Sequence, residues 1–296
     1  MYAAYFRLKE KPFSMLPNPE FIYWSDMHAK AYTMLEYGIL NNAGFTVITG
    51  EIGCGKTTLV HHLLSQIGKE VNTGLLADSQ VNTDELIRWI LMAFNQDFEQ
   101  KTEAAAFRDF RDYVQKEYAN GRRTVLIVDE AQNLSVATLE KLRTLSNINV
   151  GKDNMLQIVM TGQPQLRTLL KRPELAQFVQ RIGSEFHMTP LSQEEVRNYI
   201  VHRVHAAGCP VSLFSSKACN RIAAASGGIP RVINLLCDTA LVYGFARGSK
   251  YISEEIAEAV IADRKAQGML ASEAEETRPA PENDGRDLLL IGSQGK

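Results

Sequence analysis

Hydrophobic residues in the first two thirds of the chain alternate between short unbroken runs and longer stretches with helical spacing. The short runs are FTVITG (45–50), VNTGLLA (71–77), RTVLIVDEAQ (123–132) and NMLQIVMTG (154–162). Continuous apolar, β-branched runs are typical of strands that are buried on both faces of a parallel sheet. Between them, stretches such as TTLVHHLLSQI (57–67) place apolar residues on one helical face. This alternation predicts an α/β fold with three layers, in which helices cover both faces of a parallel sheet.

Three more helices are expected in this part of the chain. The first includes AYTMLEYGIL, from about Tyr32, and the second opens at NTDELIRWILMAF with Asn82 or Thr83 as its cap. The third is a long amphipathic helix through FRDFRDYVQKEYA, which we expect to stop at the pair Asn120-Gly121.

The pattern changes near residue 190. Ser192 and Glu195 form a capping-box signature, and the stretch from there to about residue 265 shows helical periodicity throughout. The predicted helices each open with a cap residue or a first-turn proline. We therefore expect a core domain over residues 1–190 and a small all-α lid domain over 191–265. Residues 266–296 are acidic and contain proline, which predicts a flexible tail.

Composition narrows the functional classes. The chain has 296 residues, 45% hydrophobic and 22% charged, and a formal net charge of −2, which gives no general field for nucleic acid or membrane surfaces. The four cysteines lack metal-ligand spacing and are interpreted as buried thiols of a reducing compartment. Neither a signal peptide nor an apolar run of about 18 residues is present. These features predict a cytoplasmic protein.

The first strand leads into GEIGCGKT (50–57), which fits the phosphate-binding pattern G-x-x-x-x-G-K-[ST] between a strand and a helix. Glycines allow consecutive backbone N–H groups to surround a polyphosphate, and the following helix directs its positive end at the same anion. Lys56 would reach the β- and γ-phosphates, and the Thr57 hydroxyl would be a ligand of Mg²⁺. The alternative is a glycine-rich surface turn. The predicted nucleotide-binding residues are Gly50, Glu51, Ile52, Gly53, Cys54, Gly55, Lys56, Thr57 and Thr58.

The third strand ends in a pair of carboxylates. Asp129 follows an apolar run at the edge of the sheet where ligands of open α/β sheets bind, and it is the predicted second holder of Mg²⁺. Glu130 is the predicted catalytic base, which would activate water for attack on the γ-phosphate. Alone, the pair could be a solvated strand end. The fourth strand ends in Thr161-Gly162-Gln163, and either Thr161 or Gln163 is expected to orient the attacking water.

Two arginines are further candidates. Arg181 lies just before the lid, where a cation could reach the nucleotide of a neighbouring subunit; its alternative is a surface salt bridge. Arg231 follows Gly227, Gly228 and Pro230 at the start of a lid helix, from which it could contact the γ-phosphate.

These elements, in this order, resemble the AAA+ ATPases. Within that class the chain is similar to the general secretion pathway protein A (ExeA-like) family, which includes secretion ATPases of exosortase or exopolysaccharide loci and pilus-biogenesis relatives. The resemblance covers residues 1–265 and is carried by short sequence phrases. These are MYAAYFRLKEKPFSMLPNPEFIYWSDMHAKAYTMLEYGI, GFTVITGEIGCGKTTL, VDEAQNL, LRTLSN, TGQPQLR and SGGIPRVINLLCD.

The resemblance implies an ATP hydrolase that uses ATP and Mg²⁺ and has Lys56, Thr57, Asp129, Glu130, Arg181 and Arg231 in the roles given above. It also implies a homo-oligomer with nucleotide at subunit interfaces, and an N-terminal segment, PFSMLPNPEFIYWS, that helps to wall the adenine pocket. Many such secretion proteins continue into a membrane segment and a peptidoglycan-binding domain, whereas this chain ends in the acidic tail. Cys54 is an uncommon P-loop residue, and its side chain is expected to face away from phosphate.

We therefore expect an ATPase that drives or regulates assembly of a secretion, pilus or exopolysaccharide export system of the cell envelope. Its partners would be envelope-assembly proteins, which could hold it peripherally at the inner membrane. The alternative is a DNA-dependent regulator of transposition. Residues 191–265 carry nine Lys or Arg against seven Asp or Glu, so DNA stays open as a partner but is not favoured. A small-molecule kinase is a third possibility, which the adjacent Glu130 and the lid arginine weaken.

Overall fold

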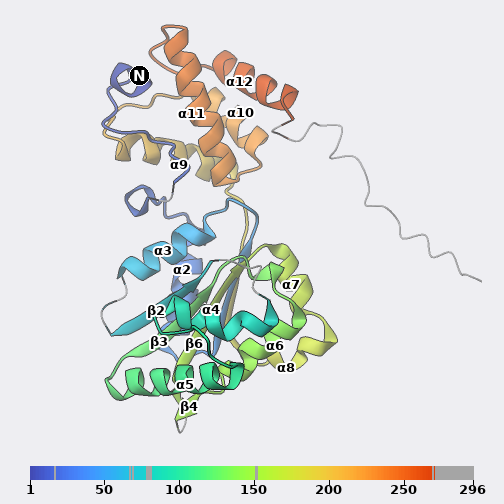
Figure 1. The fold of residues 1–296 in the computed structure, drawn as a ribbon. Helices are drawn as coiled ribbons and strands as arrows, with labels where there is room; N and C mark the ends of the chain where they lie inside the picture. Colours follow the sequence, from blue (N-terminus) through green and yellow to red (C-terminus); the bar gives the residue numbers. More distant parts are fainter. Residues whose placement is uncertain are drawn as a thin grey trace, which may run out of the picture.

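A parallel sheet with the strand order β2-β3-β6-β1-β7 forms the centre of the larger part of the molecule (Figure 1). The structure is a computed structural model, and it describes residues 1–16, 18–66, 68, 70–77, 82–150, 153–268 and 270. The strands are β1 (Phe45–Gly50), β2 (Val71–Leu76), β3 (Arg123–Val128), β6 (Leu156–Gly162) and β7 (Ile182–Met188). A separate antiparallel pair joins β4 (Asn149–Val150) to β5 (Asp153–Asn154). The predicted α/β fold with a parallel sheet is confirmed.

Helices cover both faces of the sheet, and successive side chains of a strand point to opposite faces, so each strand contributes to two cores. On β3, Leu126 and Val128 join a large core with α4, α5 and α6, whereas Val125 and Ile127 join a smaller core with α2 and α3. This two-sided burial explains the unbroken apolar runs. Strand β7 was not predicted, because it lies at the sheet edge and its sequence, IGSEFHM, includes exposed polar positions.

Helices α2 (Asp26–Leu40) and α3 (Lys56–Gln66) cover one face of the sheet. The other face packs against α4 (Leu86–Ala93), α5 (Glu103–Ala119), α6 (Val136–Leu145), α7 (Pro164–Leu170) and α8 (Ala176–Val179). Short 3₁₀ helices are η1 (Pro19–Phe21), η2 (Thr83–Glu85), η3 (Ala131–Asn133) and η4 (Pro173–Leu175). Helix α5 ends next to Asn120 as predicted. Helix α2 begins six residues before the predicted start, because Ser25 caps it by accepting from the His28 amide.

The C-terminal helices pack together beyond the end of the sheet that carries the P-loop (Figure 1). They are α9 (Gln193–Ala206), α10 (Ser216–Ser226), α11 (Pro230–Ala246) and α12 (Glu254–Ala266). The predicted capping box of Ser192 and Glu195 is present at the start of α9, and Pro230 occupies the first turn of α11. Below, we call α9–α12 the lid.

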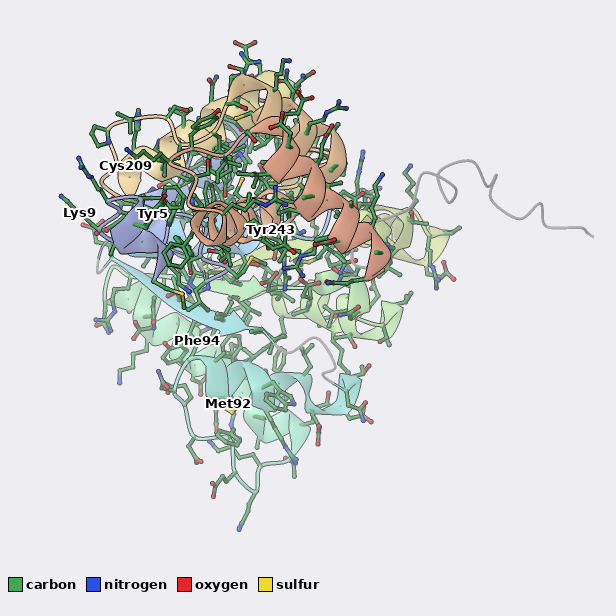
Figure 2. The ribbon with its side chains drawn as sticks, turned by 90° about the horizontal axis from the view of Figure 1, so that it is seen from above. Tyr5, Lys9, Met92, Phe94, Cys209 and Tyr243 are labelled. Atoms are coloured by element: carbon green, nitrogen blue, oxygen red, sulfur yellow. The ribbon has the colours of Figure 1, made fainter. Side chains whose placement is uncertain are left out.

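The first residues of the chain pack against the lid. Tyr2 of α1 (Tyr2–Tyr5), Phe6, Phe13 and Phe21 are buried in the hydrophobic cluster of the lid helices. Viewed from above, the labelled Tyr5 and Lys9 lie beside the lid residues Cys209 and Tyr243, whereas Met92 of α4 and the adjacent Phe94 lie below this group in the view (Figure 2). The hydrophobic side chains of the N-terminal segment therefore pack with the lid helices.

The expected division at residue 190 stays a prediction. Of the predicted tail, residues 269 and 271–296 lie outside the described residues. Among the helices that the structure describes, none has the length and apolar character needed to span a bilayer.

Candidate active site

The loop between β1 and α3 has the backbone geometry that the glycine pattern predicts. Gly53 and Gly55 adopt φ values of +84° and +102°, in the region that favours glycine. A Cβ atom at Gly53 would lie 2.5 Å from Cβ of Arg231. Cys54 is buried among the apolar residues of α2 and α3, and burial raises the pKa of its thiol. Its side chain therefore packs into the core, and the residue contributes backbone to the loop.

Lys56 is a buried cation at the start of α3. Its Nζ donates to the carbonyl oxygens of Gly50, at 2.8 Å, and Glu51, at 2.9 Å. The side chain is only 5% exposed, and within the described part of the chain no carboxylate oxygen lies within 4.0 Å of Nζ. A buried ammonium group held only by neutral carbonyls, next to a helix N-terminus and a glycine loop, suits an anionic polyphosphate.

Asp129 joins three elements at the carboxyl edge of the sheet. Its Oδ2 accepts from Thr57 Oγ1 of α3 at 2.9 Å, and its Oδ1 accepts from the hydroxyl of Thr161 at the end of β6. Oδ1 also accepts from the Glu130 amide at 2.9 Å. A carboxylate beside a threonine hydroxyl is a donor set that suits Mg²⁺, which binds oxygen ligands and retains several waters.

Glu130 has a left-handed backbone with φ +52°, an uncommon conformation for a residue other than glycine. Its Oε2 accepts from Nε2 of Gln132 at 2.6 Å and from Nε2 of Gln163 at 3.1 Å. The backbone N–H of Gln163 in turn donates to Gln132 Oε1 at 2.9 Å. The structure thus separates the two candidates of the β6 end: Thr161 contacts Asp129, and Gln163 contacts Glu130.

The two arginine candidates lie in very different places. The Arg231 amide, at the start of α11, donates to the Gly53 carbonyl at 3.1 Å, so the lid touches the P-loop. Arg181 directly precedes β7, which runs parallel to β1, so it lies at the amino ends of the strands, whereas the P-loop lies at their carboxyl ends. Its Nη1 donates to Ser146 Oγ at 3.1 Å. Because β1 has six residues, Arg181 lies about 17 Å from the P-loop of its own chain.

Sequence reasoning missed Gln132 and also His28. The imidazole of His28 links the start of α2 to the P-loop: Nδ1 lies 2.7 Å from Ser25 Oγ, and Nε2 lies 3.1 Å from the Cys54 carbonyl. A carbonyl only accepts, so Nε2 carries the proton and donates, and Nδ1 accepts from the serine hydroxyl. Burial lowers the pKa of His28, which favours this neutral form. Both residues lie within phrases that carry the resemblance, but no phosphate-binding or catalytic pattern fixes their positions, so spacing alone gave no signal for them.

These groups surround a cavity of about 300 Å³ between the sheet, the lid and the N-terminal segment. From the predicted set, it is lined by Ile52, Gly53, Gly55, Lys56, Thr57, Thr58, Glu130 and Arg231. Gly50 and Glu51 instead supply the carbonyls that hold Lys56. The rest of the lining includes Ser14, Met15, Leu16, Asn18, Phe21, Ile22 and Tyr23 of the N-terminal segment, together with Tyr199, Arg203 and Asn234 of the lid.

The sheet order, the phosphate-binding loop and the helical lid define an AAA+ protein, and residues 39–170 match the family model described as an AAA domain. In sequence, the chain is an ExeA-like protein: it is 40% identical over 253 residues to general secretion pathway protein A of Aeromonas hydrophila. That alignment covers 85% of this chain and 46% of the relative, so the chain spans about half the relative's length. The resemblance predicted from the motifs is confirmed.

Solved structures support the fold. The ORC2 protein of Aeropyrum pernix, in its ADPNP-ADP complexes, superposes with a TM-score of 0.66 at 15% identity, covering 89% of this chain and 72% of that one. The RuvB Holliday junction branch migration motor of Thermotoga maritima gives a TM-score of 0.56 at 18% identity, covering 90% and 76%. At these identities the similarity concerns the fold alone.

Proposed function

We propose that this protein binds ATP with Mg²⁺ and hydrolyses it. The observation that carries this proposal is that Lys56, Thr57 and Glu130 line one cavity. Lys56 has no carboxylate within reach among the described residues, and Thr57 donates to Asp129. Backbone amides of the loop and Lys56 would hold the phosphates. Thr57 and Asp129 would hold Mg²⁺, which when bound neutralises phosphate charge and orients the γ-phosphate.

Glu130 would act as the general base of the reaction. Its carboxylate accepts the proton of a water molecule, the water oxygen bonds to the γ-phosphorus, and the bond to the β-bridging oxygen breaks. Gln163 already donates to this carboxylate, which supports Gln163 as the residue that orients the water. Thr161 donates to Asp129, which supports a role in fixing the metal-holding carboxylate.

Arg231 would contact the γ-phosphate from the lid, because it begins the helix whose backbone touches Gly53. Arg181 is too far from its own P-loop to do so. We propose that it acts on the nucleotide of a neighbouring subunit in a homo-oligomer, as arginine fingers supplied by another chain do.

For the cellular role, we propose that ATP turnover drives or regulates assembly of an export system of the cell envelope. The similarity to general secretion pathway protein A supports this role. It also supports a cytoplasmic place beside the inner membrane through partners. The near balance of charges in the lid favours this role over DNA-dependent regulation of transposition. Stimulation of ATP turnover by duplex DNA at moderate salt would instead support regulation of transposition.

Phosphate release from ATP and Mg²⁺ tests the proposed activity directly. We expect turnover by the parental chain and a loss of about 100-fold or more in Glu130→Gln, because the amide cannot take up the proton. ATP binding should survive in this variant. The exposed Glu174→Gln is the matched control and should keep the parental rate. Parental turnover in Glu130→Gln would show that another group is the base.

A further inference from the structure

Helix α9 of the lid carries a buried arginine that faces the cavity. Arg203 is only 7% exposed, and among the described residues no carboxylate oxygen lies within 4.0 Å of its guanidinium. The group lies over the Phe21 ring, 4.8 Å from its centroid, and 5.7 Å from that of Tyr199. Burying a cation without a counter-ion is costly unless its N–H groups find other partners. Its partners therefore show what this residue does.

Those partners are three carbonyls of the N-terminal segment. Nε donates to the Pro12 carbonyl at 2.6 Å, Nη2 to Ser14 at 3.4 Å and Nη1 to Phe21 at 3.4 Å. The planar guanidinium has donors that point in several fixed directions, so one side chain can gather acceptors from a curved segment. We call residues 12–16 and 18–23 the strap. Arg203 fastens both ends of the strap to α9.

The strap supplies part of the wall of the cavity that the P-loop also lines. Met15, Leu16 and Ile22 contribute apolar surface to it, and Leu16 is 77% exposed. The strap contains neither Lys nor Arg, in contrast to the phosphate end, which has Lys56 and Arg231. A flat, uncharged ligand group suits this wall, and the base of a nucleotide is such a group.

The fastening continues to the P-loop through the lid. Tyr199, one turn before Arg203 on α9, donates through its hydroxyl to Asn234 Oδ1 of α11 at 2.8 Å. The first turn of α11 contains Arg231, whose backbone N–H donates to the Gly53 carbonyl at 3.1 Å. The base wall and the phosphate contact of the lid thus belong to one hydrogen-bonded unit.

We propose that Arg203 is a positioning residue for recognition of the nucleotide base: it holds the strap at the height above the P-loop that the base and sugar require. This inference rests on the proposed ATP binding. It makes selectivity for the base a property of the lid, because the strap is fastened to α9. A residue that only stabilised the fold would affect all ligands of the cavity equally.

The test compares ATP with inorganic tripolyphosphate, which has the phosphates but no base. Arg203→Lys keeps the charge but loses the fork of donors. We expect its dissociation constant for ATP with Mg²⁺ to rise about tenfold or more, with tripolyphosphate binding within about twofold of the parental value. Arg197→Lys is the matched control: this exposed arginine on the same helix contacts Asn220 and should leave both constants unchanged.

Equal weakening of both ligands in Arg203→Lys, or no change in either, would overturn the proposal. If that variant does not fold, Leu16→Ala gives the same contrast, because an exposed side chain can be shortened safely. It should weaken ATP several-fold and leave tripolyphosphate unchanged; unchanged ATP binding would contradict a base wall made by the strap. If the parental chain binds neither ligand, the proposed function itself fails, which is a separate outcome.

Discussion

His28 shows how a residue outside the phosphate-binding and carboxylate motifs supports the P-loop. Its neutral ring bridges Ser25 and the Cys54 carbonyl, so helix α2 fixes the loop through a side chain. The glycine pattern and the carboxylates after β3 could be predicted, because their chemistry requires fixed local spacing. His28, Gln132 and Arg203 could not, because each acts through a contact that the tertiary fold creates.

Stability should decrease in mild acid because of His28. Burial lowers the pKa of His28, so below about pH 6.5 the unfolded chain binds more protons than the folded one. The free energy of unfolding then falls by up to about 1.4 kcal/mol per pH unit for such a group, until the pH reaches the folded pKa. Burial also lowers the pKa values of His187 and His202, which add to the slope.

Guanidinium unfolding at pH 7.5 and pH 5.5 measures this effect. His28→Gln keeps an N–H donor for the Cys54 carbonyl but cannot titrate, so it should lose less stability on acidification than the parental chain. His205→Gln, at an exposed position, should lose as much as the parental chain. The same loss in His28→Gln as in the parental chain would show that His28 does not contribute.

At the scale of elements, the joint between α10 and α11 packs against the segment that leads into the lid. Gly227 and Gly228 both have positive φ, +56° and +74°. Gly228 also packs on the backbone of Leu191, where the chain passes from β7 to α9, and its carbonyl accepts from the Leu191 amide at 2.9 Å. The sequence shows this glycine pair but not its packing partner, because Leu191 lies far away along the chain.

The two glycines make a matched pair of substitutions. A Cβ at Gly228 would lie 2.1 Å from the Leu191 carbonyl oxygen, whereas one at Gly227 meets no described atom within 4 Å. Gly227→Ala should cost about 1 kcal/mol from its backbone conformation alone, and Gly228→Ala about 3 kcal/mol or more because backbone must move. Thermal unfolding measures both. Equal midpoints would contradict the close packing of this joint.

The strands also differ in how well local sequence predicts them. Those in the middle of the sheet were predictable, because burial on both faces demands apolar runs such as the one in β3. Strand β7 lies at the edge, where polar residues are tolerated, and only its pairing with β1 identifies it.

At the scale of the whole molecule, the lid and the start of the chain form one packed unit above the P-loop. The helical character of the lid was predictable from its caps and periodicity. The return of residues 1–16 and 18–21 to the lid was not, since nothing in a short aromatic segment indicates which distant helices will bury it. The proposed use of Arg181 belongs to this scale too, because it involves a second copy of the chain.

Mixing variants tests that use of Arg181. Arg181→Ala lacks the arginine but keeps its own base, and Glu130→Gln has the reverse defect. In a mixed oligomer each arginine of the second variant can serve the intact site of the first, so ATP turnover should recover partly. Arg172→Ala, at an exposed position nearby, should need no such rescue. Absence of recovery in oligomers shown by light scattering to contain both variants would contradict action across an interface.

Calorimetric titration of the parental chain with ATP and Mg²⁺ tests the central claim most directly. We expect saturable binding with one nucleotide per chain. In Lys56→Ala binding should weaken at least about 100-fold, or roughly 3 kcal/mol, because the buried cation at the phosphates is gone. If the folded parental chain takes up no ATP in the presence of Mg²⁺, or if Lys56→Ala binds it as well as the parental chain, the cavity beside the P-loop is not a nucleotide site.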